Sequence, residues 1–146
     1  MIIQNMDSYI NRLFRAIMLA MEQMKPGLKK SLEEEGVTST QFYILLYLLK
    51  NGGSKVSDLA KWMEVKPSAV TTIIDRLVHH GFVSREHDEA DRRIVRLRLT
   101  EGGKERLEGI KSKRLNILKE QLTHLSEAEI RMLTDLCEKI AGITPE

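Results

Sequence analysis

Residues 54–100 limit the possible folds more than any other stretch of this sequence. Residues 56–63 place apolar side chains at helical spacing, and after a turn of about three residues Pro67 begins a second such segment that ends at Gly81. Proline suits the first position of a helix because its missing N–H would have no partner there in any case. Two short helices joined by a tight turn are typical of a helix-turn-helix.

Two segments with alternating side chains follow the second helix and predict a β-hairpin. Residues 82–86 read as one strand, and residues 94–99 alternate more cleanly, as a half-buried strand does. The intervening residues 87–93 form a polar loop with charges of both signs. The predicted fold class is therefore mainly α with a small β-hairpin wing, built around a winged helix-turn-helix.

The predicted second helix has one apolar face and one small, polar face. The inward stripe consists of Val70, Ile73, Ile74, Leu77 and Val78. The residues left outside are Ser68, Ala69, Thr71, Thr72, Asp75, Arg76 and His79. Because the outward face is small near its N-terminus, it can approach DNA base edges, and its hydroxyl and N–H groups suit phosphates. The net charge is only +2, so this prediction depends on where the cations lie.

Long amphipathic helices are predicted on both sides of this module. Residues 5–34 carry one apolar stripe, and Pro26 inside it predicts a kink or a short break, because proline removes a hydrogen bond and clashes with the previous turn. A helix capped by Thr100 extends to about Leu122, and a last helix follows Ser126.

These flanking stripes exceed what so small a module can cover, which favours a helical interface with a second copy of the chain. We predict dimerisation helices in residues 1–35 and 101–146 around a DNA-binding domain in residues 36–100. Two recognition helices related by a two-fold axis would enter successive major grooves, roughly 34–36 Å apart, on an inverted-repeat operator.

Two helix starts carry a capping-box pattern, in which a hydroxyl is followed three residues later by Glu or Gln. Thr38 with Gln41 begins one helix, and Ser126 with Glu129 begins the other. The helix after Thr38 extends to about Lys50 and is apolar almost all round, so we expect it to be buried on most sides.

The bulk composition indicates a soluble, cytoplasmic protein. Its 146 residues fit one domain with an extension, and 42% hydrophobic residues suffice for a core. The single cysteine, Cys137, excludes an internal disulfide and fits a reducing compartment. The longest apolar run, residues 42–49, is far shorter than the ~20 residues that span a bilayer. No signal-peptide pattern precedes the first helix.

No catalytic, cofactor or metal site is predicted. The sequence contains no nucleophile elbow, no phosphate-binding glycine loop and no H-E-x-x-H motif. The histidines, at positions 79, 80, 87 and 124, lack the spacing of a zinc site. Cys137 lies on an apolar stripe, where a free cysteine is usually inert packing.

Five segments together resemble one family of regulators over nearly the whole chain. They are GVTSTQFYIL from Gly36, VSDLA from Val56, PSAVT from Pro67, LVHHGFV from Leu77 and DRRIVRLRLT from Asp91. The pattern resembles the MarR (multiple antibiotic resistance regulator) family, and its most specific part is Asp91-x-Arg93 followed by Leu99-Thr100.

This resemblance implies a homodimer that binds palindromic promoter DNA, usually as a repressor. Many members release DNA when a small-molecule effector, an oxidant or a metal binds. The residues that match the family's major-groove face are Ser68, Ala69, Thr71, Thr72 and Arg76. Arg93 matches the wing arginine that enters the minor groove, Asp91 the acid that braces it, and Arg92 a phosphate contact.

Lys55 and Lys66 depart from the family pattern, because small polar capping residues are common just before these two helices. Lysine cannot cap a helix, but it can reach a phosphate. Two alternatives remain open: a metal- or thiol-responsive regulator of the same fold, and a winged-helix protein–protein interaction module that does not bind DNA.

Overall fold

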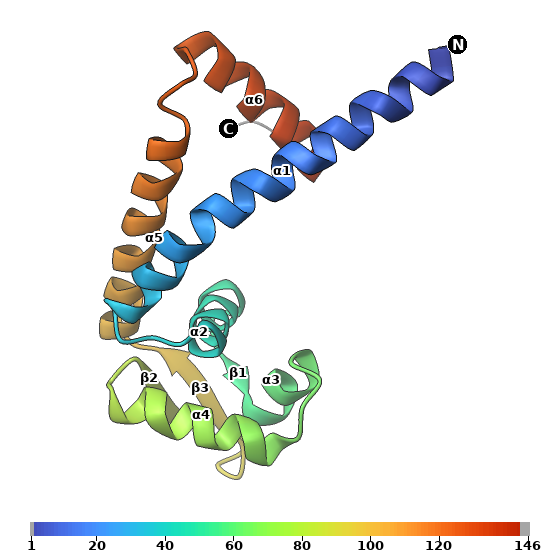
Figure 1. The fold of residues 1–146 in the computed structure, drawn as a ribbon. Coiled ribbons are helices and arrows are strands. Elements are labelled where there is room, and N and C mark those ends of the chain that lie inside the picture. Colours follow the sequence, from blue (N-terminus) through green and yellow to red (C-terminus); the bar gives the residue numbers. More distant parts are fainter. Residues whose placement is uncertain (1, 144–146) are drawn as a thin grey trace. The chain divides into compact units, whose positions relative to one another are not determined.

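The computed structural model describes residues 2–143, with side chains from residue 5 onward, and Figure 1 shows its elements. In chain order they are α1 (Ile2–Glu33), α2 (Ser39–Asn51), β1 (Ser54–Lys55), α3 (Val56–Trp62), α4 (Pro67–His79), β2 (Val83–His87), β3 (Val95–Leu99), α5 (Glu101–Gln121) and α6 (Glu127–Ala141). The predicted fold class, mainly α with a small β wing, is confirmed.

The chain forms two compact units. The central unit comprises Leu28–Lys113, and the terminal unit comprises the chain up to Gly27 together with the chain from Arg114 onward. The helix-turn-helix of α3 and α4 and the complete sheet lie in the central unit.

The hydrophobic core lies in the central unit and draws on every one of its helices. Its fully enclosed side chains are Ile44, Leu45, Leu48, Leu59, Val70, Ile74, Leu77, Val83, Leu97 and Ile110. Val70, Ile74 and Leu77 form the buried stripe predicted for α4, with Ile73 and Val78 packed at its edge. This packing determines which face of α4 is turned outward.

Both predicted capping boxes are confirmed. Before α2, Thr38 Oγ1 accepts from Gln41 N at 3.2 Å and Gln41 Oε1 accepts from Thr38 N at 2.9 Å. Ser126 and Glu129 form the same reciprocal pair before α6. Each box satisfies N–H groups that have no partner within the helix.

The sheet is antiparallel, with strand order β1-β3-β2. Strands β2 and β3 form the predicted hairpin, with Val83 opposite Leu99 and His87 opposite Val95. The short strand β1 was not predicted, because two residues are too few to show alternation. It pairs Ser54 with Leu97 and so attaches the start of the helix-turn-helix to the wing.

Two expectations about the helices need correction. The short break allowed for at Pro26 is absent, because α1 continues through it and the loss of one hydrogen bond is small beside the remaining bonds of its 32 residues. Helix α2 is buried on one side only, because Tyr43, Leu46 and Leu49 are exposed.

A pair of aromatic rings joins α2 to the end of α3 in the central unit. The ring centroids of Tyr47 and Trp62 lie 4.5 Å apart with planes tilted by 35°. Trp62 remains 49% exposed and is the single tryptophan of the chain. The pair therefore packs at the edge of the core and not at its centre.

The terminal unit has no core of its own. Among residues 5–27 and 114–143, no side chain is buried. Its exposed apolar residues on α1 are Met6, Tyr9, Ile10, Leu13, Phe14, Ile17, Met18, Leu19 and Met21. Those on α5 and α6 are Leu115, Leu118, Met132, Leu133, Leu136 and Ile140. An uncovered apolar surface of this extent is typical of an interface.

Candidate nucleic-acid interface

The outward face of α4 is open to solvent along its whole length. All seven residues predicted to lie outside, from Ser68 to His79, are exposed, whereas Val70, Ile74 and Leu77 are completely enclosed. The helix begins at Pro67, which occupies the first helical position as predicted. The geometry of a recognition helix is therefore present.

Two threonines of this face direct their hydroxyl protons back into the helix. Thr71 Oγ1 donates to Pro67 O at 2.9 Å, and Thr72 Oγ1 donates to Ser68 O at 3.3 Å. Their hydroxyl oxygens still accept hydrogen bonds, but the donors are already used.

Lys55 and Lys66 occupy the cap positions of α3 and α4, and neither makes a side-chain cap hydrogen bond. The prediction that these lysines do not cap is confirmed. Both ammonium groups lack an ion-pair partner among the described residues, so they remain available to an anion near either helix start.

Asp88 organises the wing tip, and the sequence did not single it out for this role. Its Oδ1 accepts from Ala90 N at 2.9 Å and Asp91 N at 3.3 Å, while Oδ2 accepts from Arg96 Nε at 2.6 Å. The hydrogen bond from Arg96, followed by the two backbone N–H groups, lowers the pKa of the Asp88 carboxyl. The loop is therefore held by an ionised acid at neutral pH.

Asp91 and Arg93 form the predicted pair at the end of the loop. Asp91 Oδ1 accepts from Arg93 N at 3.0 Å and from Arg93 Nε at 3.2 Å. The Arg93 side chain is nevertheless 91% exposed, so its guanidinium projects into solvent. Its entry into a minor groove stays a prediction.

An ion pair joins the recognition helix to the wing. Arg85 on β2 donates from Nη2 to Asp75 Oδ1 on α4 at 2.5 Å. Asp75 was predicted on the outward face, but its bond to Arg85 was not foreseen, because ten residues separate them. The pair helps to hold α4 and β2 in one arrangement.

The wing strands neutralise most of their own cations. Arg96 pairs with Asp88, and Arg98 pairs with Glu86 at 2.8 Å and also donates to Gly52 O. By contrast, Arg76 and Arg92 have no ion pair among residues 5–143. Arg76 and Arg92 are therefore two predicted DNA contacts whose guanidinium groups carry no ion pair in the described part of the chain.

Metal and thiol features are sparse in the described part of the chain. No group of three His, Cys, Asp or Glu side chains is placed to hold a metal ion within it. The interpretation of Cys137 as packed is wrong for the single chain, because the residue is exposed on α6, which has no buried side chain.

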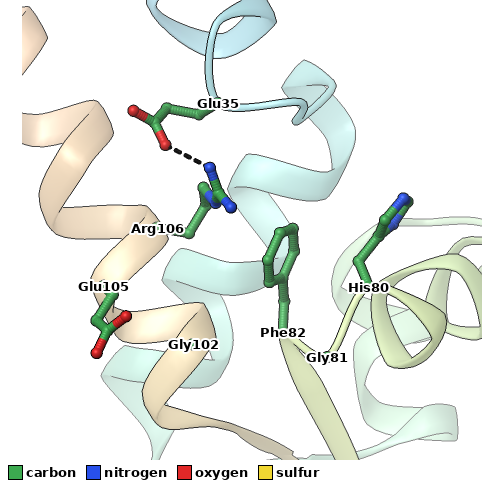
Figure 2. Close-up of a pocket in the computed structure, with 7 residues that line it drawn as sticks. All are labelled: Glu35, His80, Gly81, Phe82, Gly102, Glu105 and Arg106. Carbon is green, nitrogen blue, oxygen red and sulfur yellow. Dashed lines mark hydrogen bonds and ion pairs between the residues drawn. The ribbon is translucent and has the colours of Figure 1, made fainter.

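A polar hollow of about 330 Å³ lies elsewhere on the central unit. It is lined by Glu35, His80, Gly81, Phe82, Gly102, Glu105 and Arg106. Figure 2 shows Phe82 between Arg106, whose guanidinium carbon is 5.0 Å from the ring centroid, and His80, whose ring is 5.7 Å away. Arg106 also bonds Glu35, so a carboxylate and a ring already engage the cation. The lining lacks the apolar surface typical of small-molecule sites.

Glu35 is held between two cations beside this hollow. Its carboxylate accepts from Arg106 Nη1 at 2.7 Å and pairs with Lys113 Nζ at 2.8 Å. The hydrogen bond from Lys113, and then that from Arg106, lowers the pKa of the Glu35 carboxyl. These bonds join the turn after α1 to α5 within the central unit.

We expect Glu35→Gln to make stability less sensitive to acid. Folding lowers the pKa of the Glu35 carboxyl, so its ionised form stabilises the folded protein at every pH above the unfolded pKa of about 4.3. This stabilisation is lost as the pH falls through the pKa of the folded state. The free energy of unfolding measured in urea should therefore be larger for wild type than for Glu35→Gln at neutral pH. In strong acid the two proteins should be equally stable. Glu105→Gln, at an exposed carboxylate without an ion pair in the described region, is the control. A difference in stability between wild type and Glu35→Gln that stays the same at every pH would contradict the expectation.

A winged helix-turn-helix with an open recognition helix and an exposed arginine on its wing defines a class of DNA-binding regulators. The model of the MarR family matches residues 37–95. The HTH-type transcriptional repressor MdtR of Bacillus subtilis is 34% identical over 92% of this chain and 87% of its own length. The chain therefore belongs to the MarR family of transcriptional regulators.

Solved structures agree with this assignment. The YusO protein of Bacillus subtilis is 33% identical, with a TM-score of 0.79 over 94% of this chain and 98% of its own. Apo MarR from E. coli is 27% identical, with a TM-score of 0.69 over 88% and 95% of the two chains. Relatives whose function is named, such as MdtR, are transcriptional regulators. No described helix is long and apolar enough to cross a membrane.

Proposed function

We propose that the protein is a homodimeric repressor that binds an inverted-repeat operator in the cytoplasm. The observation that carries this proposal is the open α4 face beside the exposed Arg93. In each protomer, Ser68, Ala69, Thr71, Thr72 and Arg76 face the major groove. Arg93, braced by Asp91, enters the adjacent minor groove. Lys55, Lys66 and Arg92 contact phosphates.

The terminal unit supports a second copy of the chain as the partner. Helices α1, α5 and α6 leave large apolar side chains uncovered, and no described residue of this unit is buried. A two-fold interface would cover such faces with their own counterparts. We therefore assign dimerisation to residues 1–35 and 101–146, and DNA binding to residues 36–100.

Phe14→Glu should convert the dimer to monomer at micromolar concentration. Phe14 is 63% exposed on the α1 stripe, and a buried carboxylate without a partner opposes association. Ser8→Glu introduces the same charge on the polar face of α1 and should leave the dimer intact. Sedimentation velocity measures both variants. A dimeric Phe14→Glu protein with wild-type affinity would refute the interface.

Repression is supported by the relative MdtR, which is named as a transcriptional repressor. The test is fluorescence anisotropy of the full-length protein with duplexes from the gene's own upstream region, measured at several salt concentrations. A repressor forms a salt-sensitive complex with one of these duplexes, because phosphate contacts release counterions. Failure to bind any upstream or selected duplex would favour a protein–protein interaction module.

We further propose that a small-molecule effector lowers operator affinity. A MepR-like protein, 37% identical over 90% of this chain, was solved with pseudoligands bound, which supports ligand binding in such chains. A metal- or thiol-responsive regulator is the alternative, and exposed Cys137 is the observation in its favour. Peroxide or chelator changes operator affinity in that case and leaves it unchanged for a small-molecule sensor.

A further inference from the structure

We propose that α4 reads each half-site mainly through the C5-methyl groups of thymines in the major groove. Ala69, Thr71 and Thr72 make these contacts, so the half-site presents thymines opposite the first two turns of the helix. This inference rests on the proposed function, because it concerns what α4 recognises once the protein is on its operator.

The first two turns of α4 lack the side chains that read bases by paired hydrogen bonds. Guanine is usually read by Arg or Lys, adenine by Asn or Gln, and cytosine by an acid, whereas Ala and the methyl group of Thr contact the thymine methyl. Between Pro67 and Ile74 the outward residues are Ser68, Ala69, Thr71 and Thr72. This set favours thymine among the bases.

The hydrogen bonds of the two threonines strengthen this assignment. Each hydroxyl donates to a carbonyl of the preceding turn, Thr71 to Pro67 at 2.9 Å and Thr72 to Ser68 at 3.3 Å. The hydroxyl proton is thus not offered to a base. These bonds also restrict χ1, which holds each methyl group in one staggered position away from that carbonyl.

The next turn of α4 adds little polar discrimination. Asp75 could accept from cytosine N4, but its Oδ1 is already bonded to Arg85 on β2, which orients the carboxylate toward the wing. Arg76 is free of ion pairs in the described chain and lies beyond the small residues, where it reaches a phosphate or a guanine at one edge of the half-site. Hydrophobic contact with methyl groups is therefore the principal base-specific interaction of the first turns.

The test begins with a duplex selected from a randomised library by the full-length wild-type protein. Thymines within the half-sites are then replaced by deoxyuridine, which removes the C5-methyl group and leaves base pairing and the minor groove unchanged. We expect a loss of about three- to fivefold in affinity for each contacted methyl group, the value of one buried methyl group. Deoxyuridine outside both half-sites is the control and should have no effect.

Two substitutions at each threonine separate the methyl group from the hydroxyl. Thr72→Ser keeps the hydroxyl and removes the methyl, whereas Thr72→Val keeps the methyl and removes the hydroxyl, and Thr71 offers the same pair. The serine variants should bind thymine duplexes about three- to fivefold more weakly than wild type does. For these variants, deoxyuridine at the contacted position should cause no further loss of affinity. The valine variants should retain the preference for thymine.

Equal affinity for thymine and deoxyuridine duplexes would overturn the inference while leaving the proposed function intact. The inference also fails if the valine variants lose the thymine preference and the serine variants keep it, because the hydroxyl would then be the reader. If the library yields no enriched duplex, the proposed function itself fails. Circular dichroism of each variant verifies that α4 is still folded.

Discussion

Arg93→Ala should weaken operator binding by roughly 10- to 100-fold, as expected for a charge-assisted contact in a narrow minor groove. The Arg93 side chain is 91% exposed, and both Nε and the backbone N–H of Arg93 donate to Asp91 Oδ1. The loss should be greater on duplexes with A·T-rich flanks, because a narrow groove has the more negative potential. Anisotropy titrations at fixed salt with A·T-rich and G·C-rich flanks measure both effects.

Lys29→Ala is the matched control for this variant. It also removes one exposed cation from the central unit, but Lys29 lies on α1 and pairs with Glu33. Its operator affinity should stay within about twofold of wild type, since a distant exposed charge is screened by salt. An Arg93→Ala protein that binds both flanks as tightly as wild type would remove Arg93 from the interface.

Gly103→Ala should destabilise the central unit by about 3 kcal/mol. A Cβ atom at this position would lie 2.2 Å from Phe82 O and 2.7 Å from Leu99 Cδ1. Phe82 O cannot move freely, because it accepts from Thr100 N at 3.1 Å. The steric cost exceeds the gain of roughly 0.5–1 kcal/mol that alanine usually brings to a helix. Urea unfolding measures the difference.

Gly102→Ala, one residue earlier on α5, is the control for the glycine. A Cβ atom there would lie 3.3 Å from Gly81 O, a distance that a shift of a few tenths of an ångström relieves. We expect its stability to stay within about 1 kcal/mol of wild type. Equal stability of Gly103→Ala and wild type would mean that the corner between β3 and α5 adjusts without strain.

Local chemistry made most of the fold predictable. Pro67 at the start of α4 and the capping boxes at Thr38 and Ser126 depend on residues at most three positions apart. The period of Val70, Ile74 and Leu77 determined the buried face of α4 in the same way. Such features need no knowledge of the rest of the fold.

Contacts between distant residues could not be read in the same way. Asp75 meets Arg85, and Glu35 meets Arg106 across 71 positions, only because the core brings their elements together. The clash expected at Gly103 depends on a carbonyl just before β2 and a side chain of β3. At the wing, the family resemblance predicted that Asp91 braces Arg93, whereas the role of Asp88 required the shape of the loop.

The contact between Tyr47 and Trp62 gives the protein a spectroscopic label on one unit only. Tryptophan emission has a single source, which lies between α2 and α3 in the central unit. Far-UV circular dichroism instead sums over all helices, including those of the terminal unit. Coincident melting curves from the two signals would mean that both units unfold in one cooperative step, and separated curves would resolve them without any added dye.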